Sequence, residues 1–169
     1  FWDGREDDLE GQAGGPPLNP DEMNMKDKTE VSIRLQENSY YVQSFKSIYG
    51  DNIWENDDLV YKAMTQVIAA FERTKEFAPF DSKYDRFLKG EYDLTPLEDL
   101  GKAIFFSNNN NSCATCHVVK GEDKLGETFT NYEYHNIGTP INKELRAKNG
   151  VKAIDGGLLN NPKVADIKE

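Results

Sequence analysis

The stretch Cys113-Ala114-Thr115-Cys116-His117 decides how this chain of 169 residues is interpreted. Its spacing, C-x-x-C-H, is the attachment signal for c-type haem. Two thiols that lie three residues apart on one helical turn can form thioethers with the vinyl groups at one edge of the porphyrin. The histidine that follows then lies beneath the iron and supplies an axial nitrogen. We therefore predict one covalently bound haem c, with Cys113 and Cys116 as its tethers and His117 as the iron ligand.

Three other interpretations of the two cysteines are weaker. A disulfide at this spacing would cross-link almost nothing. A thioredoxin-like dithiol needs a βαβ setting, which the surrounding pattern does not predict. A structural zinc site needs four ligands, and His135 is the only obvious addition to the three residues of the motif.

The residue on the other face of the iron would set the chemistry of the haem. Methionine there suits electron transfer, whereas an open face permits reaction. The chain offers one further histidine, His135, and three methionines, Met23, Met25 and Met64. Met64 falls on the apolar stripe of a predicted helix, which favours a position in the core. For His135 we favour a hydrogen bond in the haem pocket or in a loop, and the sixth ligand stays unassigned.

The composition indicates a folded chain with few aliphatic side chains for a core. Hydrophobic residues make up 37% of the chain, which is below the ~45–50% usual for globular proteins. Two Trp, eight Tyr and nine Phe nevertheless argue against disorder. A large apolar cofactor could fill such a core. The length fits one domain of ordinary size or two small ones.

Charge and hydropathy exclude two classes of partner. The net charge of −10 opposes nucleic-acid binding and favours a basic protein partner, although it equally suits a plain solvated surface. The longest apolar stretches, such as residues 67–71, are far shorter than the ~20 residues that span a membrane. We predict no nucleic acid and no membrane span. Since the chain starts at Phe1 without a leader, we expect a processed chain or a piece of a longer polypeptide.

Apolar periodicity predicts an all-α fold behind an irregular N-terminal segment. Glycines and prolines interrupt any helical pattern in residues 1–28. A helical pattern then runs from residue 29 to a glycine at position 50, although Val31, Ile33 and Leu35 alone would also suit a strand. The strongest helix begins at a cap, Asn56 or Asp57, and runs to about Glu76. Its apolar stripe consists of Val60, Ala63, Met64, Val67, Ile68 and Phe71.

A further helix start is encoded at residues 95–98. The threonine is a natural N-cap, the proline takes the favoured first position, and the glutamate completes a capping box. The apolar residues that follow predict a short helix that ends near residue 107, and the asparagines at 108–111 then lead into the cysteines. After His117 many glycines and two prolines predict a loop-rich segment with at most short helices, as expected of a chain wrapped around a cofactor.

Short motifs in a fixed order run along nearly the whole chain. They are Phe1-Trp2-Asp3-Gly4-Arg5, Leu9-Glu10-Gly11-Gln12-Ala13, Pro16, Asn19-Pro20-Asp21-Glu22-Met23, Ile68-Ala69-Ala70-Phe71-Glu72-Arg73-Thr74, Phe80-Asp81, Arg86-Phe87-Leu88-Lys89-Gly90, the haem motif, Phe129-Thr130 and His135-Asn136-Ile137-Gly138-Thr139-Pro140. In this order and spacing they resemble the bacterial di-haem cytochrome c peroxidases and their MauG-type relatives. The resemblance implies two all-helical, cytochrome c-like domains, with a peroxidatic haem in the N-terminal one and an electron-transfer haem in the C-terminal one.

The resemblance also implies roles for the site residues. The haem motif at 113–117 would hold the electron-transfer haem, and Trp2 would lie between the two haems as an electron conduit. Over the open face of the peroxidatic haem, Glu22 would be the acid–base that cleaves the O–O bond, with Gln12 and Pro16 shaping the pocket. Heterolysis of peroxide needs a group that moves a proton between the two oxygens, and a carboxylate in a desolvated pocket can do this. Without the resemblance, Glu22 would be interpreted as a solvated loop acid and Trp2 as a core aromatic.

Two departures from the family pattern predict that the chain is a section of a larger protein. A second C-x-x-C-H motif is not present in the sequence. The segment expected after the motif also stops early, and in peroxidases it carries the methionine that ligates the high-potential haem. We assign residues 1–55 to the peroxidatic domain, whose distal residues they carry. Residues 56–169 are assigned to a cytochrome c-like electron-transfer domain that is incomplete at its C-terminal end.

The leading hypothesis is a section of a periplasmic di-haem cytochrome c peroxidase. This oxidoreductase would reduce hydrogen peroxide to water with electrons from a small cytochrome c or cupredoxin. One alternative is a mono-haem c-type electron carrier, and another is a MauG-like di-haem oxidase that modifies a protein substrate. The periplasmic location is expected because haem c is attached outside the cytoplasm. The resemblance further implies a second haem, calcium between the domains and a homodimer.

Overall fold

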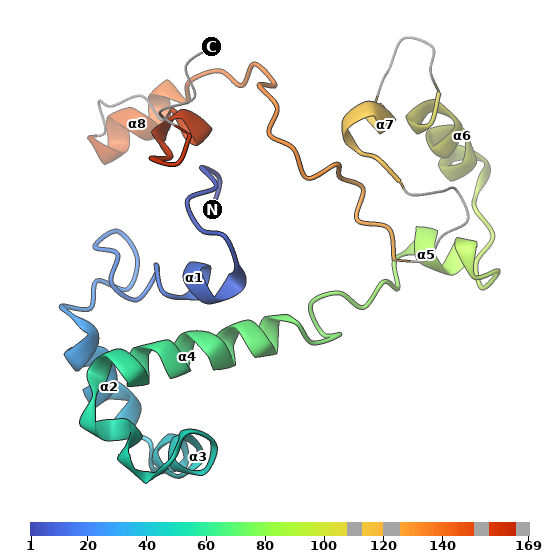
Figure 1. The fold of residues 1–169 in the computed structure, drawn as a ribbon. Helices are drawn as coiled ribbons and strands as arrows, with labels where there is room; N and C mark the ends of the chain where they lie inside the picture. The colour runs from blue at the N-terminus through green and yellow to red at the C-terminus, as the bar shows by residue number, and fades with distance from the viewer. Residues whose placement is uncertain (108–112, 120–125, 151–155, 165–169) are drawn as a thin grey trace. The chain divides into compact units, whose positions relative to one another are not determined.

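The computed structural model describes residues 1–107, 113–119, 126–150 and 156–164, and these residues form helices and no strand (Figure 1). The elements in chain order are α1 (Leu9–Ala13), α2 (Lys28–Gln36), α3 (Ser39–Tyr49), the 3₁₀ helix η1 (Asp51–Glu55), α4 (Asp57–Glu72), α5 (Lys83–Leu88), α6 (Pro96–Phe105), α7 (Cys113–Cys116), α8 (Lys143–Asn149) and the 3₁₀ helix η2 (Gly157–Asn160). The all-α prediction is confirmed. The asparagine run at 108–111 lies outside the described residues.

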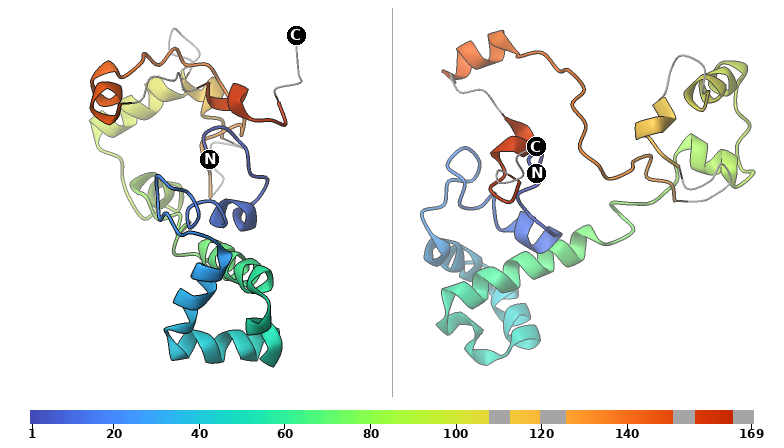
Figure 2. Two further views of the ribbon diagram at one scale, coloured as in Figure 1. Left: turned by 90° about the vertical axis from the view of Figure 1, so that its left-hand side faces the viewer. Right: turned by 45° about the horizontal axis from the view of Figure 1, so that its top comes forward.

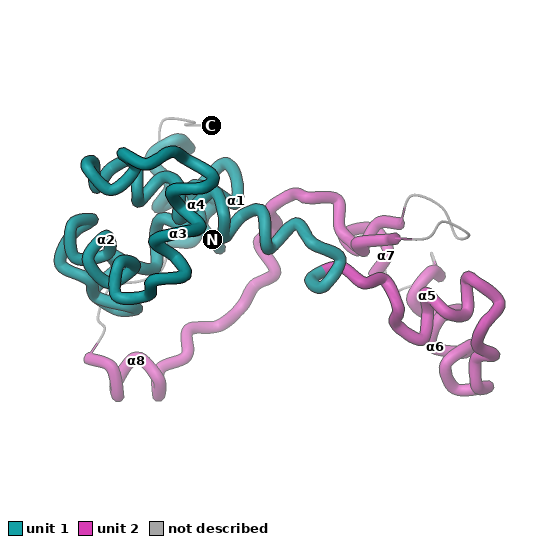
Figure 3. Tube along the Cα trace, turned by 90° about the horizontal axis from the view of Figure 1, so that it is seen from below, with its two compact units in different colours: residues 1–77, 151–169 teal, residues 78–150 magenta. Residues whose placement is uncertain are grey.

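The chain divides into two compact units (Figure 3). Unit 1 comprises residues 1–77 together with the C-terminal segment from residue 151, and unit 2 comprises residues 78–150. The predicted division between residues 55 and 56 concerns the haem domains of a whole protein, and it stays a prediction.

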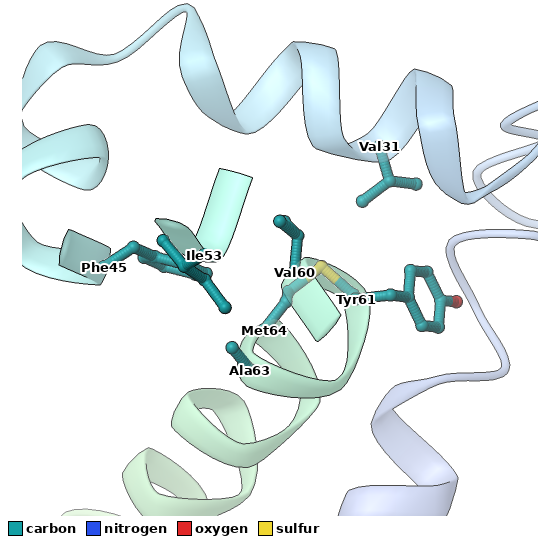
Figure 4. Close-up of a cluster of buried hydrophobic side chains, with 7 residues drawn as sticks. All are labelled: Val31, Phe45, Ile53, Val60, Tyr61, Ala63 and Met64. Carbon is teal, nitrogen blue, oxygen red and sulfur yellow. The ribbon is translucent and has the colours of Figure 1, made fainter. Parts of the chain in front are cut away.

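The hydrophobic core of unit 1 is built around α4, which contacts α1, α2 and η1 (Figure 2). Figure 4 shows its buried members: Val31, Phe45, Ile53, Val60, Tyr61, Ala63 and Met64. The first turns of the predicted apolar stripe are therefore confirmed as core. Its last residue is not, because Phe71 is 53% exposed and packs edge-on against Phe77 instead, with 4.9 Å between ring centroids.

Local capping explains where the helices of unit 1 begin and end. The Asn56 side chain accepts hydrogen bonds from two backbone amides of the first turn of α4, as a good N-cap does. Gly50 ends α3 with a φ of +97°, a conformation that favours glycine. The predicted end of α4 near Glu76 was wrong by one turn. The helix stops at Glu72, and the residues after it form turns that bring Phe77 back to Phe71.

Two helical predictions near the N-terminus need correction. Residues 1–28 are not wholly irregular, because α1 forms a helix of 5 residues capped by the Asp8 side chain. The helical pattern from residue 29 to the glycine at 50 is two helices rather than one, since Asn38 adopts an extended conformation and caps α3. Both features depend on side-chain caps, which interrupt or start a helix without changing the apolar period.

Unit 2 is built differently, because none of its described hydrophobic side chains is buried. Thr95 and Glu98 form the predicted capping box of α6, and Pro96 occupies the first turn. The leucines and the isoleucine of α6 nevertheless stay exposed, and Leu97 is 78% exposed. The sequence pattern gave no sign of α5, which Ser82 and Asp85 start with a second capping box. Across both units, no helix among the described residues is long and apolar enough to cross a membrane.

Candidate haem site

The predicted haem motif lies on a single helical turn. Residues 113–116 form α7, and the backbone N–H of His117 donates to the carbonyl of Cys113 at 3.0 Å, which extends the turn by one residue. Cys113 and Cys116 are free thiols and are not joined in a disulfide. Cys113 is exposed and Cys116 is half-buried, so both sulfurs belong to accessible residues. This is the arrangement that two thioether bonds to one porphyrin edge require.

A backbone carbonyl orients the imidazole of His117. The Nδ1 atom lies 3.0 Å from the carbonyl oxygen of Phe129. Since a carbonyl can only accept, Nδ1 carries a proton, and in the neutral imidazole Nε2 then keeps its lone pair. Histidines that bind metals commonly use their second ring nitrogen in this way. Phe129 itself has a φ of +53°, which is uncommon for a residue with a side chain and turns its carbonyl toward the ring.

A cavity of about 420 Å³ lies beside His117 within unit 2. Its lining is mostly aromatic or aliphatic and consists of Lys83, Tyr84, Leu94, Glu98, Gly101, Lys102, Phe105, Phe106, His117 and Phe129. The rings contact one another at centroid distances of 5.6 Å for Tyr84 and Phe129 and 5.9 Å for Phe105 and Phe129. An apolar cavity beside an oriented imidazole, in a unit whose described hydrophobic side chains are not buried, fits a haem.

An ion-pair network joins α5 to α6 at the cavity. The Glu98 carboxylate accepts hydrogen bonds from Lys83 Nζ at 2.8 Å, from the Tyr92 hydroxyl at 3.0 Å and from both the backbone and the hydroxyl of Thr95 at 2.9 Å. These donors, Lys83 first among them, lower the pKa of Glu98 from 4.5 to about 2. The same contact with Glu98 raises the pKa of Lys83. The ion pair thus joins the two helices at the cavity wall, and so does Lys102 Nζ of α6, which lies 4.7 Å from the centroid of the Phe87 ring of α5.

The first half of the chain matches a family model described as di-haem cytochrome c peroxidase, over residues 1–93. This match covers more than half of the chain. The chain belongs to the di-haem cytochrome c peroxidase family. The haem c that the C-x-x-C-H motif predicts is therefore the cofactor type of its family.

Individual members of the family are similar to most of this chain. Methylamine utilization protein MauG of Paracoccus denitrificans is 43% identical over 169 residues, which cover 98% of this chain and 43% of that protein. Cytochrome c peroxidase Ccp of Escherichia coli is 38% identical over 123 residues, or 69% of this chain and 23% of that protein. The structure of the diheme peroxidase BthA from Burkholderia thailandensis is similar with a TM-score of 0.85 at 27% identity, covering 98% of this chain and 40% of that one. The chain thus spans less than half the length of each.

The residues expected at the peroxidatic haem of the family lie in unit 1. Gln12 is half-buried on α1. Pro16 begins a loop, which is closed by a hydrogen bond of 3.2 Å from the backbone N–H of Met23 to the carbonyl oxygen of Pro16. Glu22 is exposed on a turn of that loop. Trp2 is 96% exposed, so this chain does not place it in a core. Gln12 thus lies on α1, and Pro16 and Glu22 lie on the loop that follows.

The alternative iron ligands have other contacts. Met64 is buried in the core of unit 1, while Met23 is exposed. The Nε2 atom of His135 lies 3.0 Å from the side-chain nitrogen of Asn131 and 3.9 Å from a carboxylate oxygen of Glu133, which ties it into its own loop. Among the described residues, no group of three or more His, Cys, Asp or Glu could hold a metal ion, and calcium stays a prediction.

Two features of the site were missed at the level of sequence. From the sequence, Phe129 was named only as part of a motif shared with the family. A phenylalanine does not by itself predict a positive φ or a backbone hydrogen bond to His117. The network around Glu98 was recognised only as a helix cap. Its partners Lys83 and Tyr92 lie 15 and 6 residues away, and ordinary helix rules do not connect them.

Proposed function

We propose that this chain is a section of a periplasmic di-haem cytochrome c peroxidase that reduces hydrogen peroxide to water. Electrons would come from a small cytochrome c or cupredoxin, and the net charge of −10 suits a basic donor. The observation that carries the proposal is the oriented His117 at the end of the C-x-x-C turn, beside an apolar cavity, in a chain that belongs to this family.

The described residues of unit 2 fit the electron-transfer haem of such an enzyme. Haem c supplies an iron centre that accepts and donates single electrons. Cys113 and Cys116 would tether it, and Nε2 of His117 would ligate the iron. The Phe129 carbonyl holds the proton on Nδ1, which keeps the ligating tautomer and raises the basicity of the ring. The aromatic side chains of the cavity would exclude water from the porphyrin face.

The residues of unit 1 would serve the peroxidatic haem, which another part of the protein would attach. Glu22 would take a proton from one peroxide oxygen and deliver it to the other. Gln12 and Pro16 would shape the pocket around it. Trp2 would pass electrons between the haems, and its side chain is almost fully exposed.

The first experiment is an intact mass of the native protein together with a pyridine haemochrome count. Two c-type haems on a polypeptide heavier than 19.2 kDa are expected. Glu22→Gln should then abolish most peroxide turnover, while Asp21→Asn, one residue away on the same turn, should leave it unchanged. One haem on a chain of 19.2 kDa would refute the peroxidase and favour the mono-haem electron carrier.

A MauG-like oxidase that modifies a protein substrate is a second candidate. The observation in its favour is the higher identity and coverage of the Paracoccus denitrificans MauG, at 43% over 98% of the chain, than of the Escherichia coli peroxidase, at 38% over 69%. Rapid peroxide-dependent oxidation of a reduced small cytochrome c would favour the peroxidase. The oxidase is favoured if peroxide is consumed only while a protein substrate becomes covalently altered.

A further inference from the structure

The short helix α1 cannot hold its position unaided. It has 5 residues, and isolated helices of fewer than ~12–15 residues are marginal in water. Its location must therefore come from contacts with the rest of unit 1. It lies along α4 in Figures 1 and 2, and α4 is the element it contacts most.

Two contacts with α4 and its C-cap set the position of α1, and one residue of α1 is buried. The Arg73 guanidinium, at the C-cap of α4, donates from both terminal nitrogens to the two carboxylate oxygens of Glu10, at 2.6 and 2.7 Å. The Tyr61 hydroxyl donates to the Gly14 carbonyl, at the C-cap of α1, at 2.6 Å. Ala13 is buried with 5% of its surface exposed. The first contact fixes the start of α1 and the second fixes its end.

The pair between Glu10 and Arg73 specifies an orientation more than it adds stability. Its side chains are 35% and 50% exposed, and ion pairs at such positions contribute little to folding. Two parallel hydrogen bonds from a planar guanidinium nevertheless allow one relative orientation of the groups, which a lysine cannot impose. Hydrogen bonding to Arg73 lowers the pKa of Glu10.

We infer that Arg73 and Glu10 are positioning residues for the peroxide pocket. Gln12 lies two residues after Glu10 on the same short helix, and the loop with Pro16 and Glu22 follows directly. A rotation of α1 would displace all three side chains. The inference rests on the proposed function, because it gives these residues a role in peroxide reduction. The bidentate pair acts by fixing α1 and does not touch the substrate.

The test uses the full-length, haem-loaded protein with Arg73→Gln and Arg73→Lys. Both variants should lower kcat/KM for hydrogen peroxide by roughly tenfold, since small displacements of positioning groups have effects of this size or larger. Hydrogen exchange of residues 9–15 should become faster in the same variants. Arg34→Gln is the matched control, because it removes another arginine from unit 1 whose ion pair, with Glu37 at 3.1 Å, does not involve α1. It should change neither measurement.

Two further variants separate positioning from a general loss of stability. Exchanging the charges, with Glu10→Arg and Arg73→Glu in one protein, should recover part of the lost kcat/KM. In a Gln12→Ala background, Arg73→Gln should lower kcat/KM much less than it does in the wild type. The effects of two substitutions are not additive when one residue acts through the other.

The outcomes distinguish this inference from the proposed function. Unchanged hydrogen exchange in α1 would overturn the inference, and so would faster exchange with wild-type kcat/KM. If the wild type does not reduce peroxide at all, the proposed function fails. Hydrogen exchange alone then decides whether the pair holds α1, with faster exchange supporting that contact and unchanged exchange refuting it.

Discussion

The Nδ1 atom of His117 and the carbonyl oxygen of Phe129 are 3.0 Å apart, and the backbone of Phe129 has a φ of +53°. A residue with a side chain in this left-handed conformation costs roughly 1–2 kcal/mol. The ring contacts of Phe129 with Tyr84 and Phe105 help to offset that cost. The backbone strain of the protein at Phe129 thus coincides with the carbonyl that orients the imidazole of His117.

The midpoint potential of the haem should depend on the conformation of Phe129. Phe129→Val and Phe129→Gly both remove the aromatic ring, but only glycine accepts a positive φ without cost. Valine should turn the carbonyl away and weaken the bond to Nδ1, which makes His117 a poorer electron donor to the iron. We expect a higher midpoint potential for Phe129→Val than for Phe129→Gly in a redox titration. Equal potentials in the two variants would contradict a role for this hydrogen bond.

Acid should weaken the junction of α5 and α6 through Glu98. Its pKa is lowered from 4.5 to about 2 by Lys83, Thr95 and Tyr92. A carboxyl group whose pKa is lowered by folding stabilises the folded state above its unfolded pKa, and that stability is lost as the pH falls through the folded pKa. The difference in Tm between wild type and Glu98→Gln should therefore shrink as the pH falls from about 4.5 to about 2. Glu144→Gln, which removes an exposed pair with Lys148, should show no such trend.

Helix boundaries set by capping side chains could be predicted where the cap precedes a clear apolar pattern. Thr95 and Asn56 were identified in this way, and both accept the expected backbone bonds. The helices α1 and α5 were missed because they are only 5 and 6 residues long, too short for a period to show. Their positions depend on contacts with distant residues, such as that of Glu10 with Arg73, which a local pattern does not contain.

The candidate site was predictable only in part. The motif gave Cys113, Cys116 and His117 because the chemistry of attachment demands that spacing. Neither the tautomer of His117 nor the network at Glu98 could be inferred, because both depend on where a loop returns in space. The apolar stripe of α6 was predicted correctly as a helix face, yet Leu97 and its neighbours are exposed. Periodicity shows which face of a helix is apolar, but it does not show what covers that face.

Each of the two cysteines should carry its own covalent bond to the haem. Replacing Cys113 and Cys116 by serine together should give a protein whose haem is extracted by acidified acetone, because no thioether remains. Each single variant should retain one covalent bond and a haemochrome spectrum shifted from that of wild type. Thr115→Ser, inside the same turn, is the control and should keep the wild-type spectrum and a haem that acidified acetone does not extract. A double variant that still carries covalent haem would contradict the proposed attachment site.

Variants of Met64 can test whether this residue belongs to the core or ligates the iron. Its side chain is 7% exposed and packs with Val60 and Ala63 in the core of unit 1. Met64→Ala should lower the free energy of unfolding of unit 1 by about 2–4 kcal/mol, because it removes packed volume and leaves a cavity. Met64→Leu conserves volume and should cost less than about 1.5 kcal/mol. Hydrogen exchange of the α4 amides measures both values, and absorption spectra of the haem should be unchanged in either variant. Loss of a methionine-ligand signature in Met64→Leu would instead place this sulfur on the iron and remove it from the core.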